Sequence, residues 1–275
     1  MKKGLVSVIM PVLNGADYIA DAIRSVLNQD YTQWELLIVD NGSTDGTTGI
    51  VNGFRDARIT LLSEHKKKGV AAARNKALQE MSGEFFCFLD ADDILPKDSI
   101  SKRINHLQDH KDVHFLDGTV EVKNVYLDKT ISLCKPSFRG EALNELASLS
   151  GRCFCGISWF IRRTPTKEYF FPESWTHAED LAFYLSIAAD GKYDFIDAIV
   201  YVVRRGHSSA MSNLQGLENG YSKLLDYMKT LPLSREQREF SRHKVRSIMT
   251  KSYLKNGNIF GALKAWQKFS KGGES

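Results

Sequence analysis

Strand-like and helix-like segments alternate over the first ninety residues, and this alternation constrains the fold more than any other feature of the chain. Short apolar runs predict buried strands, and apolar residues at helical spacing predict the helices between them. The expected strands are 5–10, 34–39, 59–62 and 85–89, and the expected helices are 17–27 and 70–81. Such alternation with short links is typical of an α/β fold with a parallel sheet, helices on both faces and ligands at the carboxyl ends of the strands.

The rest of the chain divides less clearly. Residues 113–171 alternate weakly and predict mixed strands and loops, whereas 178–189 predict a helix and 195–203 a strand. The last 55 residues have helical spacing with Lys and Arg on their polar faces. The Ser-rich stretch 207–212 is the best boundary, so we expect an α/β domain at 1–215 and a basic helical extension at 216–275.

The composition is that of a globular protein in a reducing compartment. Hydrophobic residues make up 43% and charged residues 25% of the 275, which excludes a disordered or fibrous chain. Four cysteines in a chain of this length do not make a disulfide framework. The apolar start is broken by Ser7, Pro11 and Asn14, so it predicts a buried strand instead of a signal peptide. No stretch reaches the roughly 18 apolar residues of a membrane span, and we expect a cytoplasmic location.

Positive charge is concentrated at the end of the chain. Residues 221–275 contain 12 Lys or Arg and 4 Asp or Glu, a balance of +8, whereas residues 1–220 carry −4. Apolar residues lie at helical spacing in the same segment: Ile259, Leu263, Trp266 and Phe269. A basic amphipathic helix of this kind suits peripheral contact with the anionic inner face of a membrane. The alternative is that the apolar face packs on the α/β domain; no nucleic-acid partner is expected.

Three carboxylates follow the fourth predicted strand directly, in Phe88–Asp93. Asp90 and Asp92 are two residues apart, so in an extended chain they point to the same side. Like charges this close repel each other unless a cation lies between them, and oxygen ligands suit Mg²⁺ or Mn²⁺. The alternative is a solvated acidic turn in which Asp93 caps a helix.

Two further segments could contact a nucleotide. Asp40 ends the second predicted strand and is followed by turn-forming residues, at the place where a nucleotide fold recognises a base or a ribose. Arg74 is a lone cation near the start of a predicted helix, where its neighbours are small residues. If its side chain faces the cleft, it is suited to bind a pyrophosphate. The alternative for Asp40 is a place in an Asx-rich turn without a ligand, and the alternative for Arg74 is a place on the surface.

Together these segments resemble the family 2 glycosyltransferases, which have the GT-A fold. The resemblance covers roughly residues 5–210 and is carried by VSVIMPVLNGADYIADAIRSVLNQDY, WELLIVDNGSTDGT, GVAAARNKAL and GEFFCFLDADD. It implies that Pro11, Asn14 and Asp40 line the nucleotide pocket, with Asp40 contacting uracil. The family more often has a second Asp where this chain has Asn41, which weakens the implication of uridine.

The same resemblance assigns roles to the charged residues. Arg74 would contact the nucleotide, Asp90 would lie toward the ribose, and Asp92, with Asp90 beside it, would bind Mn²⁺ or Mg²⁺. His177–Leu181 matches the family's Glu-Asp pair at a helix start, with Asp180 as general base and Glu179 on the acceptor side. The alternative is the ordinary preference for acidic residues in a first helical turn.

Two later features remain open. The stretch 204–209 resembles a part of the family in which a histidine approaches the metal or pyrophosphate, and His207 is the candidate here. Trp159 and Trp175 could stack on a sugar, or either could belong to the core.

The resemblance implies an inverting, metal-dependent transfer of a sugar, from a UDP-sugar to a hydroxyl of a glycan or lipid-linked glycan. An inactive homologue that only binds the nucleotide sugar is the alternative. An NAD-dependent dehydrogenase is excluded because the loop after the first strand has one glycine where that function needs three. A nucleotidyltransferase lacks support, since no Gly-rich phosphate loop lies near the N-terminus.

Overall fold

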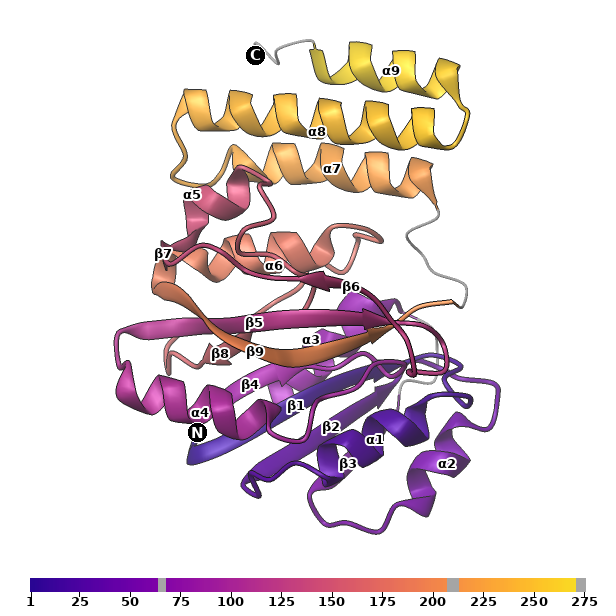
Figure 1. Ribbon diagram of the computed structural model, residues 1–275, viewed down its shortest axis with the longest axis vertical. Coiled ribbons are helices and arrows are strands. Elements are labelled where there is room, and N and C mark those ends of the chain that lie inside the picture. The colour runs from indigo at the N-terminus through magenta and orange to yellow at the C-terminus, as the bar shows by residue number, and fades with distance from the viewer. Residues whose placement is uncertain (64–67, 207–212, 271–275) are drawn as a thin grey trace.

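The computed structural model describes residues 1–63, 68–206 and 213–270. One sheet crosses the middle of the molecule, helices cover both of its faces, and three C-terminal helices are stacked beyond one face (Figure 1). This arrangement confirms the predicted α/β class and the C-terminal helical extension.

The first half of the chain forms the parallel part of the sheet. Its elements are β1 (Lys2–Val12), α1 (Ile19–Leu27), β2 (Trp34–Asp40), α2 (Thr47–Gly53), β3 (Ile59–Ser63), α3 (Val70–Glu80), β4 (Gly83–Phe88) and α4 (Ser99–Asp109). The four strands run parallel in the order β3-β2-β1-β4. The residues that follow β1, β2 and β4 therefore meet at one edge of the sheet.

The second half extends the sheet with mixed directions. Its elements are β5 (Val113–Lys123), β6 (Thr130–Cys134), β7 (Gly140–Glu141), α5 (Ala142–Ala147), β8 (Phe160–Arg162), α6 (Glu179–Ile187), a 3-10 turn (Ala188–Asp190) and β9 (Lys192–Arg204). Strand β8 lies antiparallel between β4 and β5, β9 is parallel to β5, and β6 and β7 pair antiparallel with β5 and β9. The sheet is therefore mixed, with its parallel strands concentrated in β1–β4.

Alternation along the strands divides the core between the two faces. In β1, Val8 and Met10 belong to the cluster covered by α1, α2 and α4, whereas Ile9 belongs to the cluster covered by α3, α5 and α6. Successive strand residues point to opposite faces, so one strand serves both clusters. This is why the strands of the parallel half are continuous apolar runs.

The C-terminal helices are α7 (Leu214–Met228), α8 (Arg235–Lys255) and α9 (Ile259–Ser270). Leu224 and Met228 of α7 belong to the same core cluster as α6, so α7 packs directly on the α/β body. A separate cluster joins the outer two helices, with Val245 and Met249 of α8 against Phe269 of α9. In the parts of the chain that the structure describes, no helix combines the length and the apolarity that crossing a bilayer requires.

Two short helices and one covalent bond differ from the predictions. Helix α2 forms where only turn-forming residues were recognised, and α5 lies in the segment predicted as strands and loops. Cys134 and Cys155 form a disulfide, while Cys87 and Cys153 are free and buried. The cysteine count, which indicated a reducing compartment, did not predict this bond, because it forms only where β6 and the loop before β8 meet, at a sequence separation of 21 residues.

Candidate active site

The loops after β1 and β2 are held against each other by side chain to backbone hydrogen bonds. Val12 and Asp40 are register partners at the ends of these strands, and Pro11 pairs with Val39 one step earlier. Asn14, which has a positive φ of 53°, accepts a hydrogen bond on Oδ1 from the backbone N–H of Thr44 at 2.8 Å. Asparagine tolerates this left-handed backbone better than most residues. The structure thus brings Pro11, Asn14 and Asp40 to one edge of the sheet.

Asp40, which ends β2, and Asn41, which follows it, each hold the backbone of a loop. Asp40 is buried, and its Oδ1 accepts from the N–H of Ser43 at 3.0 Å. Asn41 is also buried, and its Oδ1 accepts from the N–H of Lys68 at 2.9 Å, just before α3. The amide at position 41 therefore fixes the entrance to α3, a role that the sequence did not indicate.

Arg74 lies at the centre of a group of carboxylates. Its Nη2 is 2.9 Å from Oδ1 of Asp90 and its Nη1 is 3.4 Å from Oε1 of Glu179, and the side chain is only 5% exposed. The guanidinium also lies over the ring of Phe171, 5.3 Å from its centroid. The prediction of a nucleotide contact stays a prediction, but the surface-arginine alternative is wrong, since the arginine is buried between two carboxylates.

The charges around Arg74 keep it protonated in spite of its burial. Burial alone would lower the pKa of Arg74, but the negative charges of Asp90, Glu179 and Asp180 outweigh it and the pKa is raised. The Nε of Arg74 is buried and makes no hydrogen bond to the described part of the chain.

Glu179 and Asp180 begin α6, as the sequence predicts for the pair. Ala178, immediately before them, has a left-handed backbone with φ of 60°, which turns the chain sharply into the helix. Asp180 is half-buried, and its desolvation followed by the charge of Glu179 raises the pKa of its carboxyl to about 6, while Arg74 opposes the shift. A carboxylate with this pKa is ionised at neutral pH and close enough to it to exchange protons.

Asp92 and Asp93 are positioned by β9. Arg204 donates its backbone N–H to Oδ1 of Asp93 at 2.8 Å and its Nε to the carbonyl oxygen of Asp92 at 3.0 Å. Asp93 therefore does not cap a helix, and that alternative is wrong. Burial, and then the negative charges of Asp90 and Asp92, raises the pKa of Asp93.

The predicted divalent-metal site has no complete ligand group among the described residues. In residues 1–63, 68–206 and 213–270, no three His, Cys, Asp or Glu side chains gather in a group that could hold an ion. Asp90 is paired with Arg74, whereas Asp92 is half-buried at the same turn. Mg²⁺ and Mn²⁺ prefer carboxylate oxygens and commonly use one or two of them, completing their shell with water and phosphate oxygens. Asp92 with Asp90 beside it fits such an ion; His207 lies outside the described residues.

Several residues that support the site gave no recognisable signal in the sequence. Tyr201 on β9 accepts the backbone N–H of Asp90 on its hydroxyl at 3.0 Å, which fixes the start of the acidic turn. Asn75 donates its Nδ2 to the carbonyl oxygen of Phe171 at 2.9 Å and accepts the N–H of Phe171 at 2.7 Å. Both contacts join segments about a hundred residues apart, so only the folded chain reveals them.

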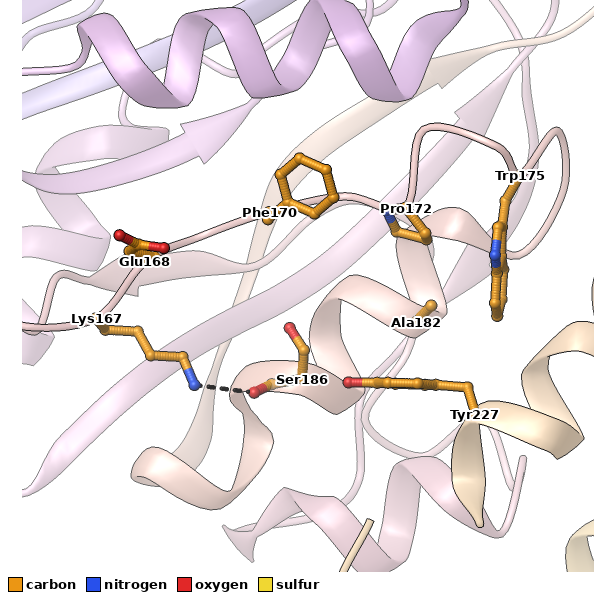
Figure 2. A pocket seen from close by; sticks show the side chains of 8 residues that line it. All are labelled: Lys167, Glu168, Phe170, Pro172, Trp175, Ala182, Ser186 and Tyr227. Carbon is orange, nitrogen blue, oxygen red and sulfur yellow. Dashed lines mark hydrogen bonds between the residues drawn. The ribbon is translucent and has the colours of Figure 1, made fainter. Parts of the chain in front are cut away.

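The two tryptophans that were left open take different places. Trp159 is fully buried, stacks on Tyr184 with ring centroids 4.2 Å apart, and donates its indole N–H to the carbonyl oxygen of Cys153. It belongs to the core. Trp175 instead lines a cavity beside α6, together with Tyr227 of α7 (Figure 2).

Comparison with known proteins identifies the family. The sequence profile of Glycosyl transferase family 2 matches residues 7–170. The chain is 34% identical over 239 residues to the Escherichia coli UDP-Glc:alpha-D-GlcNAc-diphosphoundecaprenol beta-1,3-glucosyltransferase WfgD, covering 84% of this chain and 89% of that protein. It is also 34% identical to the putative teichuronic acid biosynthesis glycosyltransferase TuaG of Bacillus subtilis, over 69% of this chain and 74% of that one.

Solved structures agree on the fold. Residues 1–349 of S. aureus TarS in complex with UDP-GlcNAc match 96% of this chain and 91% of theirs, with a TM-score of 0.70 at 16% identity. The mannosyltransferase PcManGT from Pyrobaculum calidifontis, in complex with GDP-Man and Mn²⁺, matches 98% of this chain and 76% of its own, with a TM-score of 0.59 at 22% identity. The chain therefore belongs to glycosyltransferase family 2 and has the GT-A fold.

Proposed function

We propose that this glycosyltransferase moves a sugar from a UDP-sugar to a hydroxyl of a lipid-linked glycan, with inversion at the anomeric carbon. The observation that carries the proposal is Asp180, a half-buried carboxylate at a helix start beside Glu179 and the Arg74–Asp90 pair. The similarity of the chain to WfgD, whose name gives a UDP-glucose donor and a diphosphoundecaprenol acceptor, supports the proposed classes of donor and acceptor.

The donor is proposed to bind at the edge formed by the ends of β1, β2 and β4. Pro11, Asn14 and Asp40 would line the nucleotide pocket, and Asp90 would lie toward the ribose. Arg74 would contact the nucleotide, and its unused Nε is a donor that a bound group could engage if the side chain shifts. Here the register of β1 against β2 supports the assignment, because it holds Asp40 level with the end of β1.

The acceptor is proposed to react beside α6. Asp180 would take the proton of an acceptor hydroxyl while the oxygen forms a bond to the anomeric carbon. The bond from that carbon to the diphosphate oxygen breaks, and UDP leaves with the bonding electrons. Attack opposite the leaving group inverts the anomeric centre, and general-base help of this kind is typically worth about 10²–10⁴-fold. Glu179 is proposed to lie on the acceptor side.

Mn²⁺ or Mg²⁺ is proposed as the cofactor. Asp92, with Asp90 beside it, would hold the ion, and His207 would approach it. When bound, such an ion supplies positive charge that makes the diphosphate a better leaving group.

A calorimetric titration of UDP tests the metal site without relying on turnover. We expect UDP to bind at least about tenfold more tightly with Mn²⁺ than with chelator, since the ion links a carboxylate to phosphate oxygens. Asp92→Asn should remove this difference, and Asp109→Asn, a change at an exposed position on α4, should keep it. Equal UDP affinity with Mn²⁺ and with chelator would contradict the role of the metal.

The alternative of an inactive homologue is tested by release of UDP from a panel of UDP-sugars. An active enzyme should release UDP slowly to water and faster when a GlcNAc-diphosphate-lipid acceptor is added. A protein that binds UDP but releases none with any donor and acceptor would be the inactive homologue.

Peripheral contact with the inner face of the membrane is also proposed, through α9. One face of this helix packs on α8 through Ala262, Ala265 and Phe269. A neighbouring strip is exposed, with Phe260 81%, Leu263 55% and Trp266 51% accessible. Arg246 of α8 lies over the Trp266 ring at 5.7 Å, so cationic and apolar groups adjoin as they do in interfacial helices. A cytoplasmic enzyme held there would meet a lipid-linked acceptor.

A further inference from the structure

A cavity of about 350 Å³ lies beside α6. The loop between β8 and α6 contributes Phe170 and Trp175, α6 contributes Ala182 and Ser186, and α7 contributes Tyr227 (Figure 2). This volume is within the range of small-molecule sites, which combine apolar and aromatic walls with a few polar groups. The comparisons and the family resemblance assign no role to it.

The cavity has three walls, formed by α6, by α7 and by the loop 170–175. Each of them also contacts residues around the carboxylates of the active site. Ala182 and Ser186 follow Glu179 on α6 by three and seven residues, so they share a face of the helix with Glu179, about 4.5 and 10.5 Å along the axis from it, whereas Asp180 faces another side. Tyr227 lies on α7, whose Tyr221 is close enough to Asp180 for that carboxylate to raise the pKa of its phenol, after burial has done so. A ligand in the cavity would therefore extend away from the reacting atoms along α6.

The third wall, the loop 170–175, is fixed to the residues around Arg74. Asn75, next to Arg74 on α3, binds both the N–H and the carbonyl oxygen of Phe171, and its Nδ2 also donates to Oε1 of Glu173 at 3.0 Å. The ring of Phe171 stacks on Phe183 of α6 with centroids 4.2 Å apart. The position of Trp175 is therefore set by the same contacts that set the Arg74 environment.

The charges of the wall do not suit an anionic ligand. Lys167 is the cation among the lining residues that the structure describes, and its Nζ is already 2.8 Å from Asp190 and 3.1 Å from the carbonyl oxygen of Ser186. Glu168 adds a negative charge to the same wall. A diphosphate would meet a carboxylate and no free cation there, so a phosphate group belongs elsewhere in the site.

The shape and polarity of the wall suit a sugar ring better than a hydrocarbon chain. The Trp175 and Tyr227 rings have centroids 6.4 Å apart and are nearly perpendicular, at 88°, which makes an aromatic corner. The hydroxyl of Tyr227 points from this corner toward Ser186, whose own hydroxyl donates to the carbonyl oxygen of Phe183 at 2.6 Å, and Glu168 lies toward the other end of the cavity (Figure 2). A hydrocarbon would remove the Tyr227 hydroxyl and the Glu168 carboxylate from water without offering them hydrogen bonds, whereas a pyranose offers an apolar C–H face and hydroxyl groups.

We infer that this cavity is a subsite for one neutral pyranose ring of the acceptor glycan, with Trp175 as its main contact. The inference rests on the proposed function, because only a glycan acceptor places a second sugar near Asp180. It makes Trp175 a binding residue that determines acceptor affinity and leaves donor binding unchanged.

Saturation-transfer NMR with two free sugars tests the subsite without donor or lipid. The probes are methyl N-acetyl-α-D-glucosaminide, which is neutral, and N-acetylglucosamine 1-phosphate, which is anionic. We expect the neutral probe to bind the wild type, Trp175→Phe to retain most of the signal, and Trp175→Leu to lose at least about fivefold, as loss of an aromatic contact would. Phe240→Leu, a change at an exposed aromatic residue of α8, should leave the signal unchanged. Tyr227→Leu repeats the test from the opposite wall should Trp175→Leu fail to fold.

The possible outcomes separate this inference from the proposed function. UDP titration of the same samples reports on the donor site. If the wild type does not bind UDP, that result contradicts the proposed function and says nothing against the sugar subsite. Equal signals from wild type and both folded cavity variants would overturn the subsite, as would absence of signal from the wild type. Stronger saturation of the phosphorylated probe would overturn the neutral-sugar assignment.

Discussion

Asp180 combines burial with a neighbouring carboxylate, and both effects shift its acidity in the same direction. Burial disfavours the charged form, and the negative charge of Glu179 does so as well, which together bring the pKa to about 6 although Arg74 acts against them. The group is then mostly ionised at pH 7 and still a useful proton acceptor. The geometry and the acidity of this residue agree with the role of a general base.

We expect kcat/KM to fall as the pH drops through about 6, because protonated Asp180 cannot accept a proton. Asp180→Asn should lower turnover by at least about 10²-fold, remove this limb of the profile and keep UDP affinity within a few fold. Asp197→Asn, at an exposed position on β9, is the control and should leave the profile unchanged. A variant at position 180 with near-normal turnover would move the base to Glu179.

The raised pKa of Asp180 affects stability in the opposite direction from activity: activity falls as the pH drops, whereas folding stability falls as the pH rises. The folded pKa of Asp180 lies above its ordinary value of 3.8. The group therefore contributes stability that is fully present below about pH 4 and is lost as the pH rises through about 6. Asp180→Asn should accordingly raise the unfolding midpoint in urea at pH 7 relative to wild type, and the gain should shrink at pH 4.

At this scale the sequence predicts the acidic residues better than their partners. Asp40, Asp90 and Asp92 could be found because they follow buried strands, and parallel strand ends share one edge. The pairing of Arg74 with Glu179 joins residues 105 positions apart, and no local pattern carries that information. The same holds for Asn41, whose amide fixes a loop that begins far along the chain from it.

At the scale of elements, α7 closes on the start of α6 through two glycines. A Cβ added to Gly220 would lie 2.6 Å from the carbonyl oxygen of His177, and one added to Gly216 would lie 2.3 Å from the His177 ring. These glycines are four residues apart, so they share one face of the helix. His177 and Ala178 lead directly into Glu179 and Asp180, and α7 therefore helps to position the carboxylates.

Gly220→Ala should reduce both stability and turnover. The added methyl group meets backbone atoms that cannot rotate away, so we expect a loss of about 1–3 kcal/mol and a displaced α6 start. Gly49→Ala on α2 is the matched control, since no atom lies within 4 Å of its added Cβ. Removing a glycine from that helix should stabilise the protein by about 0.5–1 kcal/mol. Urea unfolding and turnover of both variants decide this, and unchanged behaviour of Gly220→Ala would contradict the close contact.

Long periodic elements were predictable, whereas the short ones were not. The strands β1, β2 and β4 and the helices α1 and α3 follow from spacing alone, because burial imposes it. Helix α2 contains two glycines in seven residues, and burial of Thr47 and Val51 stabilises it more than its own propensity. The Cys134–Cys155 bond depends on how β6 returns beside the loop before β8, which composition cannot indicate.

At the scale of the molecule, the exposed apolar area lies on the last helix, α9, which carries two lysines, whereas the neighbouring α8 carries seven Lys or Arg and two Glu. The sequence left packing and membrane contact as alternatives, and the structure gives Phe269 to packing and leaves Leu263 and Trp266 exposed. The division into 1–215 and 216–275 stays a proposal, since α7 begins at Leu214 and is packed in the core of the body. Which helix faces a bilayer depends on the packing of three helices, so the sequence alone could not select the residues.

Flotation with liposomes tests the α9 strip. We expect the wild type to bind vesicles with anionic lipid at low salt, to bind neutral vesicles weakly, and to dissociate at high salt, because each basic residue near the surface adds about 1 kcal/mol. The double variant Leu263→Glu with Trp266→Glu should lose binding by at least about tenfold. Phe240→Glu, which changes an apolar side chain of α8 that is 58% exposed, should retain it.

Failure of the wild type to bind anionic vesicles at low salt would mean that the C-terminal helices are structural only. Light scattering on the same samples shows whether the strip joins two copies of the chain instead, since the double variant would then change the molecular mass in solution.

The contact of α7 with α6 also bears on the order in which the enzyme is made. All the strands of the sheet leave the ribosome before α7, yet Gly216 and Gly220 bear on the segment that carries the catalytic pair. At roughly 5–20 residues per second, a nascent chain would spend several seconds with a complete sheet and an open side to α6. Catalysis should therefore start only once the last helices have docked, so an unfinished chain on the ribosome would not consume nucleotide sugar.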